Sequence, residues 1–319
     1  MALKVLVTGA CGFVGSHIVE ELLETPETQV IAMDCLTYAG RLDRLEHLDR
    51  SRIKFVNYDF SQPLTDALLH YIGPVNSIIH NGSETHVARS FLYPEKFVQS
   101  NIFGTLYMLE AARRMNISKF IYVSTDEVFG PSSDRAFRES DPLLPTNPYA
   151  ATKAAGEHLV YSYFRSFGLP AVVTRTMNMF GERQHAEKFV PMTVQNILQG
   201  NYVDIHVSPS GEMGTRHWLY AGEQAKALKV LLDHGMPGES YNISAGTVAT
   251  NLSIANRIAR ILNKPLNYRK VVSSAPSHDL HYSIDDSKMR RIFPALFDFD
   301  SLFERTVLWY KYHPQYLED

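Results

Sequence analysis

Strand-like and helix-like segments alternate through the first half of the chain, and this alternation limits the possible folds more than any other feature of the sequence. Because parallel strands need a crossover connection, usually a helix, such an order predicts an α/β fold with a doubly wound parallel sheet. Strands are expected at residues 4–7, 29–34, 53–59, 76–80, 119–124 and 171–175, and helices at 15–24, 93–115 and 149–167.

Beyond residue 175 the pattern loosens, and loops rich in Gly, Pro and Ser appear between helices expected at 190–199 and 221–232. We therefore divide the chain into a first domain over residues 1–175 and a smaller C-terminal lobe over 176–319. The lobe is expected to lie over the carboxyl edge of the sheet and to bind the substrate. The segment 215–245 is expected to return to the first domain.

Composition excludes several classes of protein. The chain has 319 residues, 45% hydrophobic and 20% charged, and a net charge of −3, so nothing favours nucleic acid or a membrane surface as partner. No apolar stretch approaches the ~18 residues of a membrane span, and the chain enters a strand without a signal peptide. Cys11 and Cys35 are expected to be reduced and buried, and the 13 histidines show no metal-ligand spacing. These features predict a cytoplasmic protein without a metal site.

A glycine-rich turn follows the first strand and opens the first helix. Gly9, Gly12 and Gly15 allow a tight turn whose backbone N–H groups, with the helix N-terminus, can approach a pyrophosphate. A glycine-rich turn alone is a weak signal, but the strand–turn–helix context predicts a dinucleotide site. The first domain is therefore a dinucleotide-binding domain, and Phe13 and Val14 within the turn are further candidate cofactor contacts.

Asp34 ends the second strand, where a carboxylate can accept the hydroxyls of the adenosine ribose and repel a 2′-phosphate. This position favours NAD over NADP. Arg41 and Arg44 could receive such a phosphate, but we interpret both as surface residues on a short helix. Asp59 and Phe60 follow the third strand; they are placed either to flank the adenine or simply to end the strand.

The tripeptide Thr125-Asp126-Glu127 ends an apolar run at residues 120–124. Two adjacent carboxylates resist joint ionisation, so one tends to stay protonated as an acid while the other serves as a base. A second proton-handling pair, Tyr149 and Lys153, lies four residues apart on one helix face, where a cation can favour the phenolate. A solvated turn and a surface pair are the alternatives. Together the groups predict an enzyme that moves several protons at one small substrate.

These motifs resemble those of the extended short-chain dehydrogenases/reductases, with their Rossmann domain. More narrowly, the chain resembles the nucleotide-diphosphate-glucose 4,6-dehydratases, of which the dTDP-glucose enzymes are the best known. Similar segments lie at 34–40, 84–90, 124–130, 147–150, 187–191, 216–220, 241–243 and 276–279, so nearly the whole chain is covered. Thr125-Asp126-Glu127 is the specific element, because related epimerases, decarboxylases and GDP-mannose dehydratases resemble it with one acid or none.

The resemblance implies a lyase with a bound NAD that is regenerated in each cycle. Tyr149 would take the proton of the C4 hydroxyl, supported by Lys153, and Thr125 would orient the sugar through O4. Glu127 would then abstract the C5 proton while Asp126 protonates the departing C6 hydroxyl. Hydride returns to C6, which gives a 4-keto-6-deoxy sugar.

The resemblance also implies which residues bind the two ligands. The cofactor would contact Gly9, Gly12, Phe13, Val14, Gly15, Asp34, Thr37, Asp59, Phe60, Ser124, Tyr149 and Lys153. The nucleotide sugar would contact Glu84, His86, Thr125, Asn178, Glu187, Lys188, Arg216, Asn251 and His278. For His86 a ligand contact and a role within its own loop stay open. Family members form homodimers through long helices, here 93–115 and 149–167, so a homodimer is expected.

Four positions depart from the family pattern: Ala88, Glu182, His217 and Ala275 replace an aspartate, a proline, an aspartate and an arginine. All lie near the nucleotide end or its supporting loops, so the sequence leaves open whether the sugar carries dTDP, UDP or another nucleotide. Two features of the sequence argue against other functions. Asp126 argues against a nucleotide-sugar epimerase or decarboxylase, and the Tyr149–Lys153 pair argues against a non-catalytic NAD-binding scaffold.

Overall fold

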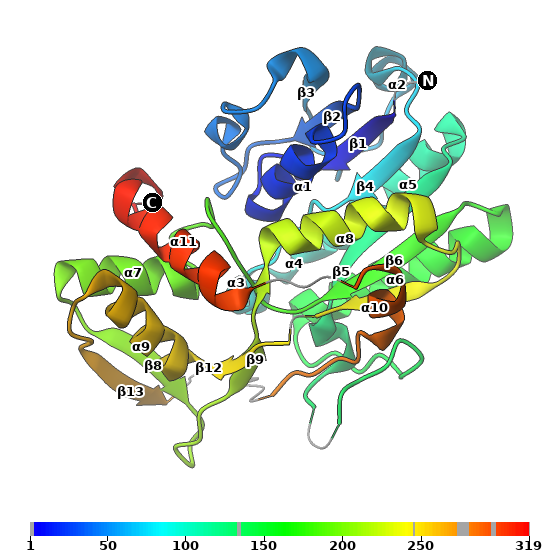
Figure 1. Ribbon diagram of the computed structural model, residues 1–319. Coiled ribbons are helices and arrows are strands. Elements are labelled where there is room, and N and C mark those ends of the chain that lie inside the picture. Colours follow the sequence, from blue (N-terminus) through cyan, green and yellow to red (C-terminus); the bar gives the residue numbers. More distant parts are fainter. Residues whose placement is uncertain (1–2, 133–134, 245, 273–280, 295–297, 319) are drawn as a thin grey trace.

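A seven-stranded parallel sheet forms the centre of the protein (Figure 1). The computed structural model describes residues 3–132, 135–244, 246–272, 281–294 and 298–318. The strands, in the order in which they lie side by side, are β11 (Ser240–Ile243), β6 (Ala171–Thr176), β5 (Lys119–Thr125), β4 (Ser77–His80), β1 (Lys4–Thr8), β2 (Gln29–Asp34) and β3 (Ile53–Asn57). Each neighbouring pair is parallel, which confirms the doubly wound α/β fold.

Helices cover both faces of the sheet because successive side chains along a buried strand point to opposite faces. Val5 and Val7 belong to the core that includes α1 (Phe13–Leu23) and α8 (Ala221–His234), whereas Leu6 belongs to the opposite core. That second core contains side chains of α2 (Asp66–Ile72), α5 (Gly104–Met115) and α6 (Pro148–Phe167).

The helix expected over 93–115 is present in three parts. It begins as α4 (Pro94–Phe97), continues as a π-helix, η3 (Val98–Phe103), and ends as α5. Residues 87–92 form a further helix, α3 (Val87–Leu92). π-helical segments are rare in proteins, and those that occur are often found at functional sites. This one carries Asn101, whose side chain reaches the loop after β4.

Helix α6, which carries the Tyr149–Lys153 pair, has sequence signals at both ends. The Asn147 side chain accepts a hydrogen bond from the backbone N–H of Ala150 at 2.8 Å, and Pro148 is the first helical residue. Gly168 ends the helix in the left-handed conformation, with φ +67°. The first turn of α6 is therefore fixed beside the carboxyl end of β5.

The rest of the chain forms a lobe beside the carboxyl edge of the sheet (Figure 1). Its own core joins α7, α9 and α11 with β8. Within the region, β11 and α8 return to the first domain, since β11 pairs with β6 and α8 packs against α1. The elements are β7 (Met179–Phe180), α7 (Phe189–Gln199), β8 (Val203–Val207), β9 (Thr215–His217), β10 (Leu219–Tyr220), β12 (Val248–Thr250), α9 (Asn251–Leu262), β13 (Tyr268–Val272), α10 (Ser287–Ile292) and α11 (Phe299–Tyr312).

Four short helical turns complete the described structure: η1 (Leu42–Leu45), η2 (Arg50–Arg52), η4 (Asp126–Phe129) and η5 (Pro314–Tyr316). Both cysteines are free thiols; Cys11 is buried as expected, whereas Cys35 is partly exposed. Among the described helices, none has the length and apolar character needed to cross a membrane.

Candidate active site

The glycine turn between β1 and α1 is packed so closely that larger residues do not fit. Gly9 has φ +63°, a conformation that favours glycine. A Cβ on Gly15 would clash with the carbonyl oxygen of Gly9 and would lie 2.8 Å from the Cα of Ala10. Gly9, Gly12, Phe13 and Val14 line a cleft of about 630 Å³, and Gly15 begins the buried side of α1.

Asp34 lies at the carboxyl end of β2 and lines the same cleft. Its two carboxyl oxygens accept the backbone N–H groups of Cys11 at 2.9 Å and Leu36 at 2.8 Å. Burial raises the pKa of Asp34, while these two N–H donors and the Arg44 cation oppose the rise. Asp34 thus connects the glycine turn to the loop after β2, and Thr37 in that loop lines the cleft too.

The structure corrects our interpretation of Arg44. Arg44 is only 1% exposed, and its guanidinium donates to backbone carbonyls, including that of Cys11 at 2.9 Å. Arg41 is half-buried and pairs with Asp43 at 2.8 Å. A residue of the C-terminal lobe, Arg183, supplies a further carbonyl that covers Arg44. The short helix was expected, but the contact from the lobe has no local signal in the sequence.

Asp59 and Phe60 also line the cleft. The Phe60 ring is buried between Gly82 and Gly104, where any Cβ would lie within 3 Å of it, and it meets the His80 ring edge-on at 5.1 Å. The Asp59 carboxylate accepts the N–H of Ser61 at 2.9 Å. Ser124, a further predicted cofactor contact, is buried on β5 outside this cleft.

Thr125, Asp126 and Glu127 lie at the junction of β5 and η4. The Thr125 hydroxyl donates to Asp126 Oδ1 at 3.1 Å and accepts the Glu127 N–H at 3.3 Å. Asn147 Nδ2 donates to Glu127 Oε2 at 2.9 Å, so the residue that caps α6 also holds the second carboxylate. Among the described atoms, Asp126 Oδ2 is buried without a hydrogen-bond partner. An unsatisfied buried oxygen of this kind is costly unless a ligand engages it.

The two carboxylates have different environments. Burial, followed by the negative charge of Glu127, raises the pKa of Asp126 to about 7, while the Thr125 hydroxyl and the Arg216 cation oppose the rise. Asp126 is only 3% exposed, whereas Glu127 is partly exposed. Near neutrality Asp126 can therefore carry a proton, as a general acid requires, and a second, more exposed carboxyl group lies beside it.

Tyr149 and Lys153 are both buried on the first turns of α6. Burial raises the pKa of the Tyr149 phenol above its usual range, and the charges of Glu127 and Asp126 add to the rise. Burial lowers the pKa of Lys153 to about 7. The Lys153 ammonium donates to the carbonyl oxygen of Val123 on β5 at 2.6 Å. The structure thus places Tyr149 beside the two carboxylates and directs Lys153 toward the adjacent strand.

The predicted substrate residues fall into two groups. Glu84, Glu187 and Lys188 line the cleft, and His86 Nε2 lies 3.6 Å from Glu187 Oε2. The His86 ring also accepts the N–H of Arg89 at 3.4 Å and so caps the N-terminus of α3. His86 therefore has a structural role in its own loop, whether or not it also contacts a ligand.

The second group, Asn178, Arg216 and Asn251, lies outside the cleft lining. Arg216 on β9 pairs with Ala249 of β12, and Asn251 follows two residues after Ala249 at the start of α9. Arg216 and Asn251 therefore lie near each other. The Arg216 cation acts on the pKa of Asp126, which places Arg216 near that carboxyl group. His278 lies outside the described residues.

Known proteins resemble this chain in sequence and in fold. Residues 6–296 match a family model described as GDP-mannose 4,6 dehydratase. The low-salt glycan biosynthesis protein Agl12 of Haloferax volcanii is 38% identical over 91% of this chain and 92% of its own length. A dTDP-glucose 4,6-dehydratase of Streptomyces niveus is 36% identical over 97% of this chain and 93% of its own. The crystal structure of DesIV, a dTDP-glucose 4,6-dehydratase from Streptomyces venezuelae with NAD and TYD bound, matches with a TM-score of 0.92 at 33% identity and covers 99% of both chains.

The chain belongs to the nucleotide-sugar 4,6-dehydratase family. As a member, it is a hydro-lyase with a Rossmann-type sheet, which confirms the resemblance derived from the sequence.

One residue that shapes this dehydratase site, Asn101, was not predicted from the sequence. Asn101 of the π-helix binds both backbone groups of Glu84, accepting its N–H at 2.9 Å and donating to its carbonyl oxygen at 3.0 Å. The same side chain donates to Thr152, the neighbour of Lys153, at 3.0 Å. Asn101 therefore joins the loop after β4 to α6. The sequence carries no clear signal for this role, because Asn101 follows two other polar residues, Gln99 and Ser100.

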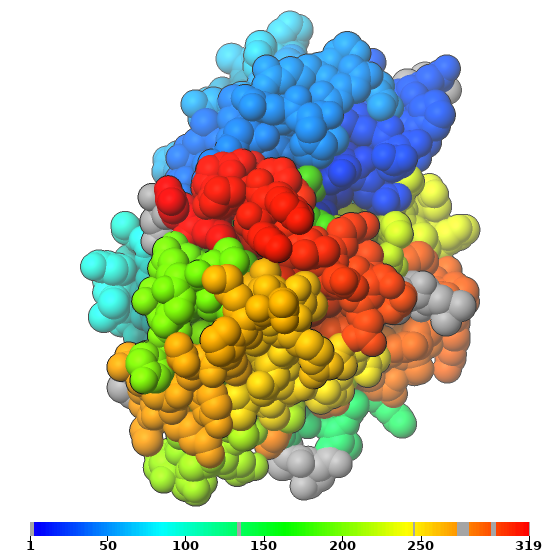
Figure 2. All heavy atoms as spheres, turned by 60° about the vertical axis from the view of Figure 1, so that its left-hand side comes forward, coloured from blue at the N-terminus to red at the C-terminus, as the bar shows by residue number. Residues whose placement is uncertain are grey.

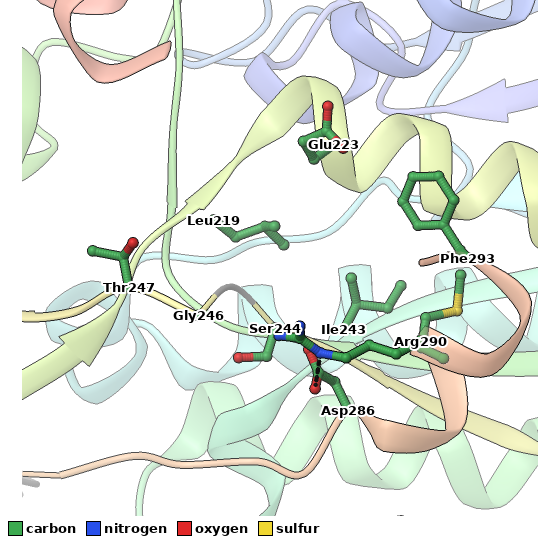
Figure 3. A pocket seen from close by; sticks show the side chains of 10 residues that line it. Leu219, Glu223, Ile243, Ser244, Gly246, Thr247, Asp286, Arg290 and Phe293 are labelled. Carbon is green, nitrogen blue, oxygen red and sulfur yellow. Dashed lines mark hydrogen bonds and ion pairs between the residues drawn. The ribbon is translucent and has the colours of Figure 1, made fainter. Parts of the chain in front are cut away.

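Figure 3 shows a second, smaller cavity of the dehydratase, about 210 Å³ in volume, near the carboxyl end of β11. Glu223, Asp286 and Arg290 are its charged lining residues, and Arg290 pairs with Asp286 at 2.7 Å. None of the site residues predicted from the sequence lines it.

Proposed function

We propose that this dehydratase uses bound NAD to convert a nucleotide-diphosphate glucose into the nucleotide-diphosphate 4-keto-6-deoxyglucose. The observation that carries the proposal is the pair of adjacent carboxyl groups beside Tyr149, one buried with its pKa near 7 and one partly exposed. An elimination of water needs one group to accept a proton and another to donate one at the same moment, and this pair supplies both.

The residues present fit NAD. Only glycines fit at Gly9 and Gly15, so the turn can bring backbone N–H groups against a pyrophosphate at the N-terminus of α1. Asp34 stands at the carboxyl end of the second strand, where an acid can accept ribose hydroxyls. Solved relatives support the same cofactor, since DesIV was crystallised with NAD. When bound, NAD⁺ takes up a hydride from C4 of the sugar and returns it to C6.

In the first step Tyr149 accepts the proton of the C4 hydroxyl as the C4–H bond is broken. Burial and two neighbouring carboxyl groups hold the phenol protonated, so the step needs a cation close by to favour the phenolate. Lys153 and the positively charged nicotinamide ring are the cations proposed for this role. The Thr125 hydroxyl, fixed by Asp126 and the Glu127 N–H, orients O4.

In the second step the new 4-keto group acidifies C5. Glu127 removes the C5 proton, and the electron pair left behind forms the C5–C6 double bond as the C6–O bond breaks. Asp126 donates its proton to the leaving oxygen, which departs as water. Asn147 keeps Glu127 in place for this step through its 2.9 Å hydrogen bond.

In the third step C6 receives the hydride and C5 takes back the proton that Glu127 removed. The proton that Tyr149 took up balances, through solvent, the one that Asp126 gave to the leaving water. No net oxidation occurs, and the product differs from the substrate by one water.

The nucleotide is proposed to be dTDP or UDP. Lys188 and Arg216 are suited to a diphosphate because cationic donors form strong hydrogen bonds to phosphate oxygens. Relatives named dTDP-glucose 4,6-dehydratase favour the first of the two nucleotides.

We propose that the enzyme is a homodimer in the cytoplasm. Helices α5 and α6 pack side by side, and apolar side chains on and beside them are exposed. Phe97 and Leu109, by contrast, are buried in the monomer and are unavailable to a partner. The exposed apolar residues are Leu92, Tyr93, Val98, Phe103 and Phe167.

A substrate panel tests the reaction. Purified protein is incubated with dTDP-, UDP-, GDP- and CDP-glucose, and the products are analysed by mass spectrometry. Loss of one water from a dTDP or UDP sugar supports the proposal. An epimerase leaves the mass unchanged, a decarboxylase would need an acid sugar, and a non-catalytic scaffold gives no product.

Two variants test the role of Tyr149. Tyr149→Phe should abolish turnover while NAD stays bound, and Tyr202→Phe, an exposed tyrosine on the far lobe, should retain wild-type turnover as the matched control. Unchanged activity in Tyr149→Phe would refute the assigned role.

A further inference from the structure

Arg44 is among the largest fully buried side chains of the protein, although it lies on a turn of only four residues in the connection between β2 and β3. Its guanidinium donates to three backbone carbonyl oxygens: Cys11 at 2.9 Å, Arg183 at 3.0 Å, and Ala39. Each acceptor belongs to a different segment of the chain.

The three segments are the walls of the cofactor cleft. Cys11 lies in the glycine turn, Ala39 lies in the loop that follows Asp34, and Arg183 lies in the C-terminal lobe beside Gln184. Arg44, Ala39 and Gln184 line the cleft themselves. One side chain therefore joins the two walls formed by the first domain to the wall formed by the lobe.

The segment 181–184 is anchored from the side of the lobe. The Tyr310 hydroxyl on α11 donates to the carbonyl oxygen of Gly181 at 2.9 Å and accepts the N–H of Gln184 at 2.8 Å. Arg183 itself has φ +67°, and its guanidinium pairs with Glu20 of α1 at 2.5 Å. Figure 2 shows the C-terminal segment (red) lying between the N-terminal half (blue) and the rest of the lobe (green and orange). Arg44 thus holds the glycine turn against a fixed support.

The charge of Arg44 is also unusual. Within the described part of the chain, no carboxylate forms an ion pair with it, and its hydrogen-bond partners are neutral carbonyls, although the charges of Asp34 and Asp43 act on it from farther away. An unpaired charge is expensive to bury, so such a site favours an anion nearby. The turn whose carbonyl it holds is the one that would face the pyrophosphate.

We propose that Arg44 is a positioning residue that slows the release of NAD, by locking the glycine turn and the loop after β2 to the C-terminal lobe. The inference rests on the proposed function, in which NAD is regenerated at the end of every cycle and has no need to leave. It adds to that function a reason why the cofactor stays bound. The glycine turn alone does not connect the first domain to the C-terminal lobe, whereas Arg44 does.

The test compares Arg44→Met and Arg44→Lys with Arg50→Met. Arg50 lies on the same connection, is 66% exposed in its side chain and pairs with Glu46, and it does not line the cleft, so its variant removes the same charge at a distance from the site. NAD bound per protein chain is measured after gel filtration. NAD dissociation is measured without substrate, and the melting temperature is measured with and without added NAD.

We expect NAD to dissociate about tenfold faster from Arg44→Met, a change equivalent to about 1.4 kcal/mol. The rise in melting temperature on adding NAD should shrink in that variant. Arg44→Lys should lie between wild type and Arg44→Met, since a lysine keeps the charge and some donors but loses the planar fork. Arg50→Met should match wild type.

The outcomes separate the two proposals. If wild type neither retains nor binds NAD, the proposed function fails together with this inference. If wild type retains NAD and both Arg44 variants release it at the wild-type rate, only the inference is overturned. A purely structural role is distinguished as well, because it would lower the melting temperature with and without NAD by the same amount. Should Arg44→Met not fold, the Arg44→Lys dissociation rate decides.

Discussion

The ion pair between Glu157 and Arg175 offers the most direct test of how this site is supported. Glu157 lies one helical turn after Lys153 on α6, and Arg175 lies on β6 beside Ser124 of β5. The side chains are 0% and 3% exposed, and they meet through three hydrogen bonds of 2.7–3.2 Å. The guanidinium also lies 4.7 Å from the centre of the Phe129 ring, in the turn that carries the two carboxylates.

The expected cost of breaking this pair follows from its burial. Removing one partner of a buried pair leaves an uncompensated charge and costs about 3–5 kcal/mol. The entropy of unfolding scales with length, and 319 residues give about 0.7 kcal/mol per kelvin near the melting temperature. Glu157→Leu and Arg175→Met should therefore each lower the melting temperature by about 4–7 °C.

The double variant Glu157→Leu/Arg175→Met distinguishes a cost of broken pairing from a cost of lost packing. Replacing a buried pair with apolar residues of similar volume is often neutral or stabilising, so at least half of the loss should be recovered. Thermal unfolding followed by circular dichroism, with urea unfolding as a second measurement, gives all three values. Single variants that cost less than about 1 kcal/mol, or a double variant equal to the sum of the singles, would contradict the reasoning.

Three further predictions concern the site and its surroundings. Asp126→Asn should lower kcat by about 10²–10⁴-fold, and the wild-type fall in activity as pH rises through about 7 should disappear from the pH–rate profile of the variant. Burial lowers the pKa of His80 to about 3. The neutral ring therefore contributes fully to stability above its unfolded pKa of about 6.5, and this contribution is lost as pH falls toward 3. The melting temperature of His80→Gln should decline less steeply than that of wild type over this range. Gly15→Ala should prevent NAD binding because its Cβ meets the backbone of Gly9 and Ala10, and retained NAD in a folded variant would be inconsistent with that packing.

The sequence was most informative where a local pattern is enough. Alternating apolar runs located six strands of the sheet to within a few residues, since the periodicity of a buried strand and of an amphipathic helix is local. Asp34 and the glycines could be placed because parallel strands bring their carboxyl ends to one edge. The seventh strand, β11, was expected only as part of a returning segment, because it pairs with a strand more than sixty residues earlier.

Long-range contacts account for what the sequence did not show. The residues next to Arg44 in the sequence suggest a surface position. One of the carbonyl groups that contact its buried guanidinium belongs to Arg183, 139 positions later. Lys153 shares a helix face with Tyr149, as predicted, but its ammonium binds Val123 because β5 passes directly beside α6. Helical spacing determines which face a side chain occupies, whereas the neighbouring strand determines its partner.

One physical cause accounts for the acid–base character of the whole site. Burial is the largest influence on both Asp126 and Lys153, and it disfavours the charged form of each. The pKa of the Asp126 carboxyl therefore rises to about 7, and the pKa of the Lys153 ammonium falls to about 7. Both groups can thus exchange a proton near neutral pH. Glu127, by contrast, is partly exposed, and Asn147 holds its carboxylate. In the proposed reaction the buried carboxyl group is therefore the acid and the partly exposed one is the base.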